Sequence, residues 1–552
     1  MSVAAPTVVG LARDWAHKCP DRVWMKERSG DDRRQWTWQE SLAQSDAVAA
    51  WLQAELGEKG TRIAILSRNR PHWFMADLAI AAAGHVSVPL FTTLTADIGQ
   101  YILEFSEARM LILGEAENWE RLRDIVPDHV RIVTLPGIEA PPGSVAWEDI
   151  VAEHAGKRPE HECRSGDLYT IVFTSGTTGK PKGVMQTHTS MILPMQRTVK
   201  TVPSRLHPRF LSYLPLSHIA ERQIVYVQSL IQGAQVSFNE DLGTLVRDMS
   251  ETRPNLFFGA PRVWEMLRQG VVGKFGGPDA FERAFAADPA GVSEKVRTAL
   301  GFTDYDYLLC GAAPIPTTLL KWYQQLGICV VEGFGQTEAM SLVLNTPDRN
   351  RTGSVGQPLD GVELRLSEQG ELLCKADGLS PGYYKQPQKT AETFVDGWVH
   401  TGDKARIDAD GFVFLTGRVA DYFKTLHGKF VAPVPIEDQF AANPDVEQLC
   451  LLGRGLAKTV MVCVLSAAAQ QKPAADVETS LRASAEALNQ AVEKHARIGV
   501  IIVSNTPWTI ENGLLTPTLK IKRDAVESRL GRDAPALATK AAESGQILVV
   551  NV

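Results

Sequence analysis

Short apolar runs rich in β-branched residues recur between residues 62 and 331, separated by stretches with helical spacing. The runs that we expect to form strands lie at 62–66, 110–113, 131–135, 169–173, 235–238, 307–309 and 328–331. Strands that alternate with helices are typical of α/β units with substantially parallel sheets. The pattern therefore predicts an α/β fold for this part of the chain.

The pattern changes between residues 353 and 417, where Gly and Pro turns separate short segments and indicate a small β-rich subdomain. Its expected strands lie at 362–366, 371–374, 397–400 and 411–415. Beyond Arg418 the mixed pattern returns, with an expected helix at 477–495 and an expected strand at 499–503. We predict a large domain of mixed α/β subdomains plus the β-rich subdomain over 1–418. A small α+β C-terminal domain follows over 419–552.

The stretch most similar to a membrane helix runs from 73 to 91. It contains Asp77, Gly84, His85 and Pro89, whereas a spanning helix needs about 20 mostly apolar residues without such interruptions. We interpret it as a buried helix followed by a strand. The N-terminus has no basic segment and does not resemble a signal peptide, and peripheral contact with a membrane stays open.

The 552 residues carry 57 Lys and Arg against 64 Asp and Glu, a formal charge of −7, and 44% of them are hydrophobic. This composition is ordinary for a soluble enzyme and lacks the basic excess that nucleic-acid binding requires. The seven cysteines form no Cys-x-x-Cys pair and no zinc-finger spacing. We expect reduced thiols in a cytoplasmic protein that binds no nucleic acid.

Residues 169–188 carry the strongest chemical signal. An apolar run leads into Thr174-Ser-Gly-Thr-Thr-Gly179, where glycines let backbone N–H groups turn toward one point and hydroxyls add donors. Lys180 and Lys182 follow, so the segment predicts a cradle for a polyphosphate. A Walker P-loop is disfavoured because the glycines are too close together and Pro181 follows the first lysine. Taken alone, the run is also compatible with an ordinary polar turn.

The segment Thr174-Ser-Gly-Thr-Thr-Gly-Lys-Pro-Lys-Gly-Val184 resembles the phosphate loop of the ANL superfamily, which comprises adenylate-forming acyl-CoA synthetases, peptide-synthetase adenylation domains and luciferases. Further family segments follow in the expected order from about residue 10 to 530. The resemblance implies binding of ATP, Mg²⁺ and coenzyme A and a mobile C-terminal domain. It implies nucleotide contacts from Thr174, Ser175, Gly176, Thr177, Thr178, Gly179 and Lys182.

Three further segments resemble the acyl and adenine contacts of the superfamily. Residues 211–218 end in His218, which implies a wall of the acyl site. The segments Gly311-Ala-Ala-Pro314 and Glu332-Gly-Phe-Gly-Gln-Thr-Glu338 imply nucleotide contacts from Gly311, Ala312, Glu332, Gly333 and the ring of Phe334. Each has an ordinary alternative, a hydrogen-bonded structural histidine or a turn after a strand.

The end of the last segment resembles the metal site of the superfamily. Thr337 would contact the α-phosphate, and Glu338 would hold Mg²⁺ with Thr174 as a second metal contact. Magnesium prefers one or two carboxylates together with phosphate oxygens and water. A Thr-Glu pair in isolation is more commonly a helix cap.

The segment Trp398-Val-His-Thr-Gly-Asp403 resembles the one whose aspartate binds the ribose diol, a task that suits two accepting carboxylate oxygens. Arg418 resembles the nucleotide-contacting arginine at the end of the large domain, and Gly428 falls at the passage expected for the pantetheine arm of coenzyme A. A turn aspartate and a surface arginine are the alternatives. One departure is Ala420, where the superfamily usually has a charged hinge residue. Hinges need not be charged.

Residues 508–523 resemble the tail of long-chain acyl-CoA synthetases, with Lys520 at the adenylation lysine. Its charge would bridge the carboxylate nucleophile and the α-phosphate as the two anions meet. Lys522 and Arg523 are competing cations nearby.

The resemblance implies an ATP-dependent acyl-CoA synthetase with His218, Thr337, Glu338 and Lys520 in catalytic roles. A carboxylic acid, expected to be a medium- to long-chain fatty acid, would become an acyl-AMP and then an acyl-CoA. Alternatives are an acyl-AMP ligase that serves another acceptor such as a carrier protein, a non-catalytic nucleotide-binding protein and a light-emitting oxygenase. The oligomeric state stays open.

Overall fold

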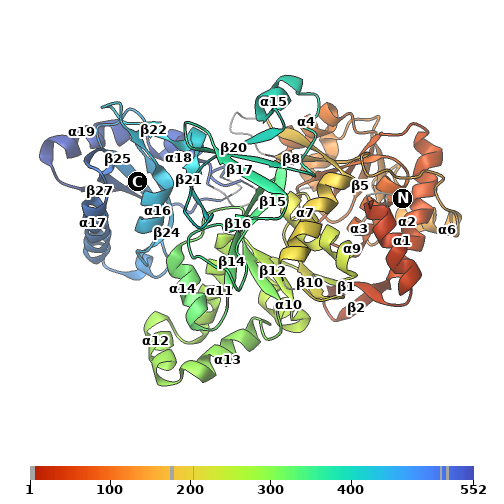
Figure 1. Cartoon of the computed structure of the whole chain (residues 1–552), viewed down its shortest axis with the longest axis horizontal. Helices are drawn as coiled ribbons and strands as arrows, with labels where there is room; N and C mark the ends of the chain where they lie inside the picture. Colours follow the sequence, from red (N-terminus) through yellow and green to blue (C-terminus); the bar gives the residue numbers. More distant parts are fainter. Residues whose placement is uncertain (1–5, 118, 175–179, 203, 510–511, 517–520) are drawn as a thin grey trace.

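The computed structural model describes residues 6–117, 119–174, 180–202, 204–509, 512–516 and 521–552. Figure 1 shows a large N-terminal domain at the right and centre and a small C-terminal domain at the left end of the long axis. Both are mixed α/β, which confirms the expected fold class. The expected boundary between 418 and 419 stays a prediction, and β21 (Val413–Arg418) ends at that position.

One sheet of the described chain has seven strands in the order β7-β6-β5-β3-β4-β8-β9, with all neighbours parallel except β8 and β9. The strands are β3 (Arg62–Leu66), β4 (Val86–Leu90), β5 (Met110–Leu113), β6 (Arg131–Thr134), β7 (Val145–Ala146), β8 (Leu168–Thr174) and β9 (Lys182–Thr187). The expected strands at 62–66 and 110–113 are confirmed. Both are almost wholly buried, as continuous apolar runs in a parallel sheet require.

A second sheet has nine strands within the described residues, in the order β16-β15-β14-β13-β12-β10-β11-β1-β2. They are β1 (Val23–Ser29), β2 (Asp32–Thr37), β10 (Arg209–Ser212), β11 (Gln235–Phe238), β12 (Leu256–Gly259), β13 (Tyr307–Cys310), β14 (Val330–Gln336), β15 (Ala339–Leu344) and β16 (Gln357–Pro358). The centre is parallel and both edges are antiparallel. β14 runs beyond the expected 328–331 because its second half pairs with β15.

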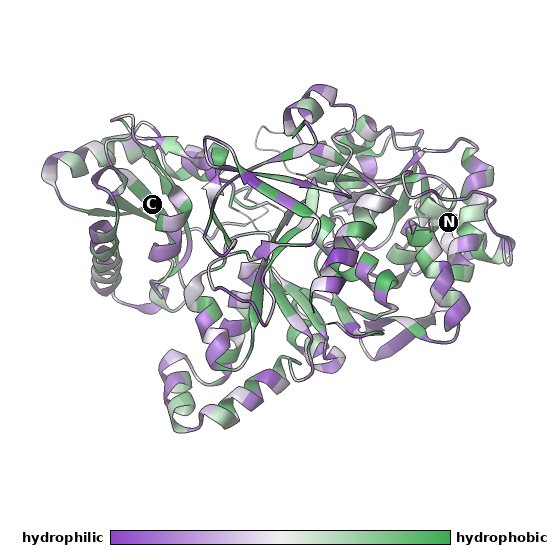
Figure 2. Cartoon of the chain, in the orientation of Figure 1, coloured by the Kyte–Doolittle hydropathy of each residue, from purple (hydrophilic) through white to green (hydrophobic). Residues whose placement is uncertain are grey.

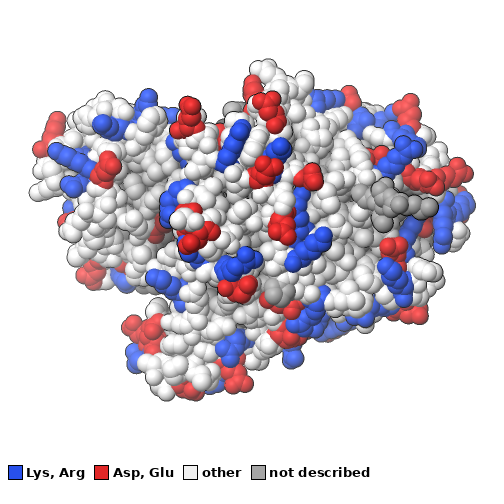
Figure 3. Space-filling model, viewed as in Figure 1, with Lys and Arg blue, Asp and Glu red and all other residues white. Residues whose placement is uncertain are grey.

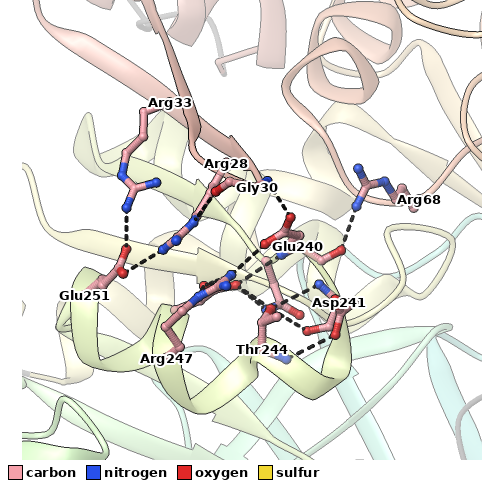
Figure 4. A network of polar contacts seen from close by, with 11 residues as sticks. Arg28, Gly30, Arg33, Arg68, Glu240, Asp241, Thr244, Arg247 and Glu251 are labelled. Atoms are coloured by element: carbon pink, nitrogen blue, oxygen red, sulfur yellow. Dashed lines mark hydrogen bonds and ion pairs between the residues drawn. The ribbon is translucent and has the colours of Figure 1, made fainter.

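Ion pairs fasten the β1–β2 edge hairpin to its neighbours (Figure 4). Arg28 and Arg33 lie 2.7 and 3.7 Å from the two carboxylate oxygens of Glu251 in α10 (Leu245–Thr252). The Gly30 amide donates to Glu240 Oε1 at 2.7 Å. Charged side chains of this kind are one way in which a protein protects an exposed sheet edge.

The helices around the two sheets cover them on both faces (Figure 1). They are α1 (Val8–Lys18), α2 (Trp38–Leu56), α3 (Pro71–Ala82), α4 (Ala96–Ser106), α5 (Trp119–Leu122), α6 (Trp147–Glu153), α7 (His188–Thr201), α8 (Ile219–Glu221), α9 (Gln228–Gln232), α10, α11 (Pro261–Lys274), α12 (Pro278–Ala287), α13 (Pro289–Ala299) and α14 (Thr317–Gln325). Every residue of α3 is buried, and β4 follows it, which confirms the interpretation of 73–91. Among the described helices, none combines the length and the apolar character that crossing a membrane requires.

The expected β-rich subdomain is confirmed as an antiparallel sheet. Its strands are β17 (Val362–Leu366), β18 (Glu371–Ala376), β19 (Phe394–Val395), β20 (Trp398–Ile407) and β21, with the short helix α15 (Pro387–Thr393) before β19. β20 extends well beyond the expected 397–400 because it pairs with β18, β19 and β21.

The C-terminal domain contains a four-stranded sheet and a two-stranded hairpin within its described residues. Its elements are β22 (Phe423–Lys424), β23 (Phe430–Val431), α16 (Pro433–Phe440), β24 (Val446–Leu452), β25 (Thr459–Leu465), α17 (Ala474–Ala491), β26 (Ile498–Ser504), α18 (Arg523–Leu530), α19 (Ala534–Ser544) and β27 (Leu548–Asn551). β26 confirms the expected strand at 499–503. The helix expected at 477–495 begins earlier, after Pro473, and ends where Val492 adopts an extended conformation.

Figure 2 shows the hydrophobic residues concentrated in the strands of the sheets, whereas α12 and α13 carry many hydrophilic residues. Figure 3 shows acidic and basic side chains interspersed over one face of the molecule. All seven cysteines are free thiols. The interior is therefore mostly apolar sheet faces, and most charged side chains lie at the surface, with the buried Asp77 and Arg222 among the exceptions.

Candidate functional site

The β8–β9 hairpin positions the two ends of the predicted phosphate cradle. Its apolar strand β8 is buried over its central residues, and Thr174 at its end pairs in register with Lys182 at the start of β9. The expected contacts Ser175, Gly176, Thr177, Thr178 and Gly179 lie outside the described residues. The structure therefore brings Thr174 and Lys182 together at the mouth of this hairpin.

Residues 380–384 pack alongside β9 and bring a tyrosine to the same place. Tyr383 forms a bridge with Val184, and the flanking amides bond across, Met185 N to Gly382 O at 2.9 Å and Tyr384 N to Gly183 O at 2.8 Å. This register places the aromatic ring of Tyr383 beside Lys182.

The side chains of Lys182, Tyr383 and Glu338 form one cluster. Lys182 Nζ lies 5.2 Å from the centroid of the Tyr383 ring, and Tyr383 Oη donates to Glu338 Oε1 at 2.6 Å. A backbone bond from Ser380 N to Glu338 O at 3.0 Å fixes the same junction. A cation and a fixed carboxylate thus lie at the end of the hairpin that carries the phosphate-loop sequence.

Burial, followed by the neighbouring Lys389 ammonium, lowers the pKa of Lys182 to about 8. The Glu338 carboxylate opposes this shift, while Arg418 adds to it. A lysine in this environment is half-desolvated and surrounded more by cations than by anions. It would gain from a bound anion.

We expect kcat/KM for ATP to fall above about pH 8, because the free protein loses the Lys182 charge as pH rises through its pKa. Below that pH the ammonium is present, so Lys182 contributes no further pH dependence. A Lys182→Arg variant keeps its charge and should lack this alkaline limb. Initial rates at limiting ATP between pH 6.5 and pH 9.5 test this, and identical profiles for the two proteins would contradict it.

Asp403 and Arg418 face each other on adjacent strands of the β-rich subdomain, β20 and β21. Arg418 Nε lies 3.0 Å from Asp403 Oδ1, and Arg418 Nη1 donates to the Thr401 carbonyl at 3.2 Å. Asp403 is 7% exposed, and its amide donates to Thr401 Oγ1 at 3.1 Å. The carboxylate is held in a defined position by the turn of the strand and by the arginine.

The predicted adenine contacts lie on the neighbouring strands β13 and β14, where Cys310 pairs with Glu332. A Cβ at Gly311 would lie 3.3 Å from the Gly333 carbonyl oxygen, so the two backbones approach closely. Ala312 adopts a φ of 68° just after β13, and Phe334 is half-buried.

Glu332 is 8% exposed, and burial raises the pKa of its carboxyl to about 7. The amide of Gly353 donates to it at 3.0 Å. Thr337, also 8% exposed, accepts at its carbonyl from Gln186 Nε2 at 2.6 Å. The bond from Gln186 ties the turn that carries Thr337 and Glu338 to β9.

His218 lies at the N-cap of α8, and Gly428 lies in the C-terminal domain. His218 begins α8, and its Nδ1 accepts from the Ala220 amide at 3.2 Å, a capping contact that suits the structural alternative. Gly428 has a φ of 71° in the turn between β22 and β23, and a Cβ there would meet no described atom within 4 Å. Lys520 lies outside the described residues. The roles of these three residues stay predictions.

Sequence reasoning missed three residues of the site, namely Tyr383 in the cluster itself, Lys389 on α15 and Gln186 on β9. Tyr383 bonds to a carboxylate 45 positions away, and Gln186 bonds to a carbonyl 151 positions away. The contact of Tyr383 arises from the pairing of residues 380–384 with β9, and that of Gln186 from the packing of β9 against the turn that carries Thr337. A Tyr-Tyr pair directly after Pro381-Gly382 was the local signal for the first.

A Tyr383→Phe variant keeps the ring beside Lys182 and removes the bond to Glu338. We expect the Mg²⁺ concentration for half-maximal activity to rise about tenfold, since outer partners of a metal ligand typically contribute 10–100-fold to affinity. A Mg²⁺ titration at fixed ATP measures this. The neighbouring Tyr384→Phe is the matched control, and equal Mg²⁺ dependence in both variants would show that the bond has no such role.

The chain is similar in sequence to known families and proteins. The profile described as AMP-binding enzyme matches residues 12–384, and the profile described as AMP-binding enzyme C-terminal domain matches 421–532. The long-chain-fatty-acid–CoA ligase FadD15 of Mycobacterium bovis is 28% identical over 563 residues, covering 91% of this chain and 92% of the relative. Fatty acyl-CoA synthetase A of Dictyostelium discoideum is 28% identical over 85% of this chain and 81% of its own.

Solved structures show the same fold. The anthranilate CoA ligase AuaEII in complex with anthranoyl-AMP has a TM-score of 0.80 at 21% identity, covering 98% of this chain and 99% of its own. The A-PCP didomain of carboxylic acid reductase from Segniliparus rugosus, in complex with AMP, has a TM-score of 0.81 at 22% identity, covering 98% of this chain and 83% of its own.

Proposed function

This chain belongs to the AMP-binding enzyme family of the adenylate-forming ANL superfamily, and on that basis we propose that it converts a fatty acid into its acyl-CoA. In the first step the carboxylate attacks the α-phosphorus of ATP, forming acyl-AMP and releasing pyrophosphate. In the second step the thiol of coenzyme A attacks the acyl carbon, forming the thioester and releasing AMP. The thiol proton passes to the departing AMP or to solvent.

The cluster at the β8–β9 hairpin carries this proposal. Lys182 and the loop before it would hold the β- and γ-phosphates, because a half-buried ammonium in cationic surroundings favours a bound polyanion. Asp403, fixed by Arg418, would accept from the two ribose hydroxyls. Lys520 would offset the repulsion between the carboxylate and the α-phosphate. His218 would line the acyl site, and Gly428 the pantetheine passage.

Glu338 is suited to a magnesium ion that arrives with the nucleotide. Its Oε1 accepts from Tyr383, so the carboxylate is oriented, and a single carboxylate is a typical protein share for Mg²⁺. No group of three or more His, Cys, Asp or Glu side chains within the described residues forms a metal cage. Phosphate oxygens, water and the predicted contact Thr174 would supply the other ligands. The ion would neutralise phosphate charge.

The curated relatives support a fatty acid as the substrate, because FadD15 and fatty acyl-CoA synthetase A are named for this activity and align over more than four fifths of both chains. The solved relatives named for aryl acids and reductases share the fold. Discrimination per methylene is only about 1–3 kcal/mol even in a formed pocket. The chain length therefore has to be measured.

The test is product analysis by mass spectrometry with Mg·ATP and a panel of C2 to C18 and aryl acids, with and without coenzyme A. We expect AMP and acyl-CoA with medium- to long-chain acids. Acyl-AMP without a thioester would indicate another acceptor, such as a carrier protein. ATP binding without pyrophosphate release for any acid would contradict the proposed function.

A further inference from the structure

The helix α15 brings a second lysine to the predicted phosphate site. It follows the Tyr383 segment directly, and the Tyr383 amide donates to Thr390 Oγ1 at 2.9 Å. A Cβ at Gly382 would lie 2.3 Å from the Thr390 side chain, so the helix packs tightly on this segment. The packing places Lys389, in the first turn of α15, beside the ammonium of Lys182.

Two ammonium groups side by side repel each other, and burial strengthens the repulsion. Arg418 acts on Lys182 as a further cation. The nearby carboxylates are already engaged, Glu338 with Tyr383 and Asp403 with Arg418. None of the ion pairs within the described residues includes Lys389. Such an arrangement is stabilised when a multivalent anion lies between the cations.

The nearby Lys385 differs from Lys389 because its charge is paired with a carboxylate. Its Nζ lies 2.8 Å from Glu107 and donates to the Phe105 carbonyl at 3.1 Å. Its charge is therefore neutralised at the surface. Lys385 and Lys389 lie four positions apart in one segment, but only Lys389 lies beside Lys182.

We propose that Lys389 binds the β- and γ-phosphates of ATP and the pyrophosphate that leaves, acting as a second cation opposite Lys182. This inference rests on the proposed function and adds a nucleotide-binding residue from α15, outside the phosphate loop. The adenylation step gains from it, because pyrophosphate departs with more negative charge than it carried within ATP. The transfer of the acyl group to coenzyme A occurs after pyrophosphate has left and should not depend on Lys389.

The test compares Lys389→Gln with the control Lys385→Gln and the conservative Lys389→Arg. For Lys389→Gln we expect about a tenfold rise in the KM for ATP and in the inhibition constant of pyrophosphate. We expect no change in thioester formation from chemically prepared acyl-AMP and coenzyme A. Lys385→Gln should stay within about twofold of the wild type, and Lys389→Arg should recover most of the loss.

Calorimetric titration of inorganic pyrophosphate into the wild type and Lys389→Gln separates this proposal from the proposed function, because it requires neither an acid nor turnover. Weaker binding of pyrophosphate by Lys389→Gln supports the inference even if no acid is activated. Equal pyrophosphate binding and equal ATP KM in the Lys389→Gln and Lys385→Gln variants would overturn it. An equal loss in the thioester step would also overturn it, because that would indicate general damage to the fold.

Discussion

Replacing Lys520 with alanine is expected to slow acyl-AMP formation by about 10²–10³-fold, the usual effect of removing one group that stabilises charge in a transition state. The carboxylate and the α-phosphate are both anions, and Lys520 would supply the positive charge between them. Transfer from a preformed acyl-AMP to coenzyme A should change by less than about threefold, because the α-phosphate attack is already complete. Separate assays of the two steps measure this.

The exposed Lys522 is the matched control, because it lies two positions away on the same segment. Its amide donates to the Leu514 carbonyl at 2.9 Å, and Arg523 pairs with Glu437 at 2.7 Å, so the residues after Lys520 are anchored by groups that the substitution leaves intact. Lys522→Ala should stay within about twofold of the wild type. An equal loss in both variants, or an equal loss of both half-reactions, would contradict the role of Lys520.

Replacing Asp77 with asparagine is expected to destabilise the large domain by about 3–5 kcal/mol, because it leaves a buried arginine without its counter-ion. Asp77 and Arg222 are both fully buried, and their side chains lie 2.6 Å apart. Tyr169 also donates to Asp77, and Arg222 donates to Thr170 Oγ1 at 2.5 Å. The melting temperature of the large domain should fall by about 3–6 °C, measured by calorimetry.

The exposed pair Asp14 and Lys18, 3.8 Å apart on α1, provides the comparison. Asp14→Asn should change the stability by less than about 1 kcal/mol, because exposed pairs are solvated in either state. A double variant that also replaces Arg222 with methionine should recover part of the loss. A small effect of Asp77→Asn alone would show that the buried charge finds another partner. Arg222 begins the π-helix Arg222–Val227, and its amide donates to the His218 carbonyl at 3.3 Å, so the buried pair lies next to the predicted acyl wall in the chain.

The local sequence pattern was sufficient to predict the strands whose side chains are buried on both faces of a sheet. The strands at 62–66 and 110–113 match β3 and β5 because continuous apolar runs have one favourable place in a parallel sheet. The helix and strand within 73–91 followed from the interruption by Gly84 and Pro89. The predicted ends of a strand were wrong where pairing with distant strands extended it, as in β14 and β20.

The candidate site likewise contains residues that the sequence predicts and contacts that only the tertiary fold creates. Motif resemblance indicated Lys182, Glu338, Asp403 and Arg418, and the fold brings the members of each pair or cluster together. The contacts of Lys389 depend on the packing of α15 against a segment aligned with β9, and no local spacing encodes that packing. The Asp77–Arg222 pair joins residues 145 positions apart, which only the tertiary fold determines.

The most direct test of the central claim is acid-dependent exchange of labelled pyrophosphate into ATP without coenzyme A. Exchange requires that the protein form acyl-AMP and reverse that step, so it reports adenylation alone. We expect exchange with medium- to long-chain fatty acids and its loss in Lys520→Ala. Absence of exchange with every acid in the panel, from a folded protein that binds ATP, would contradict the proposed formation of acyl-AMP.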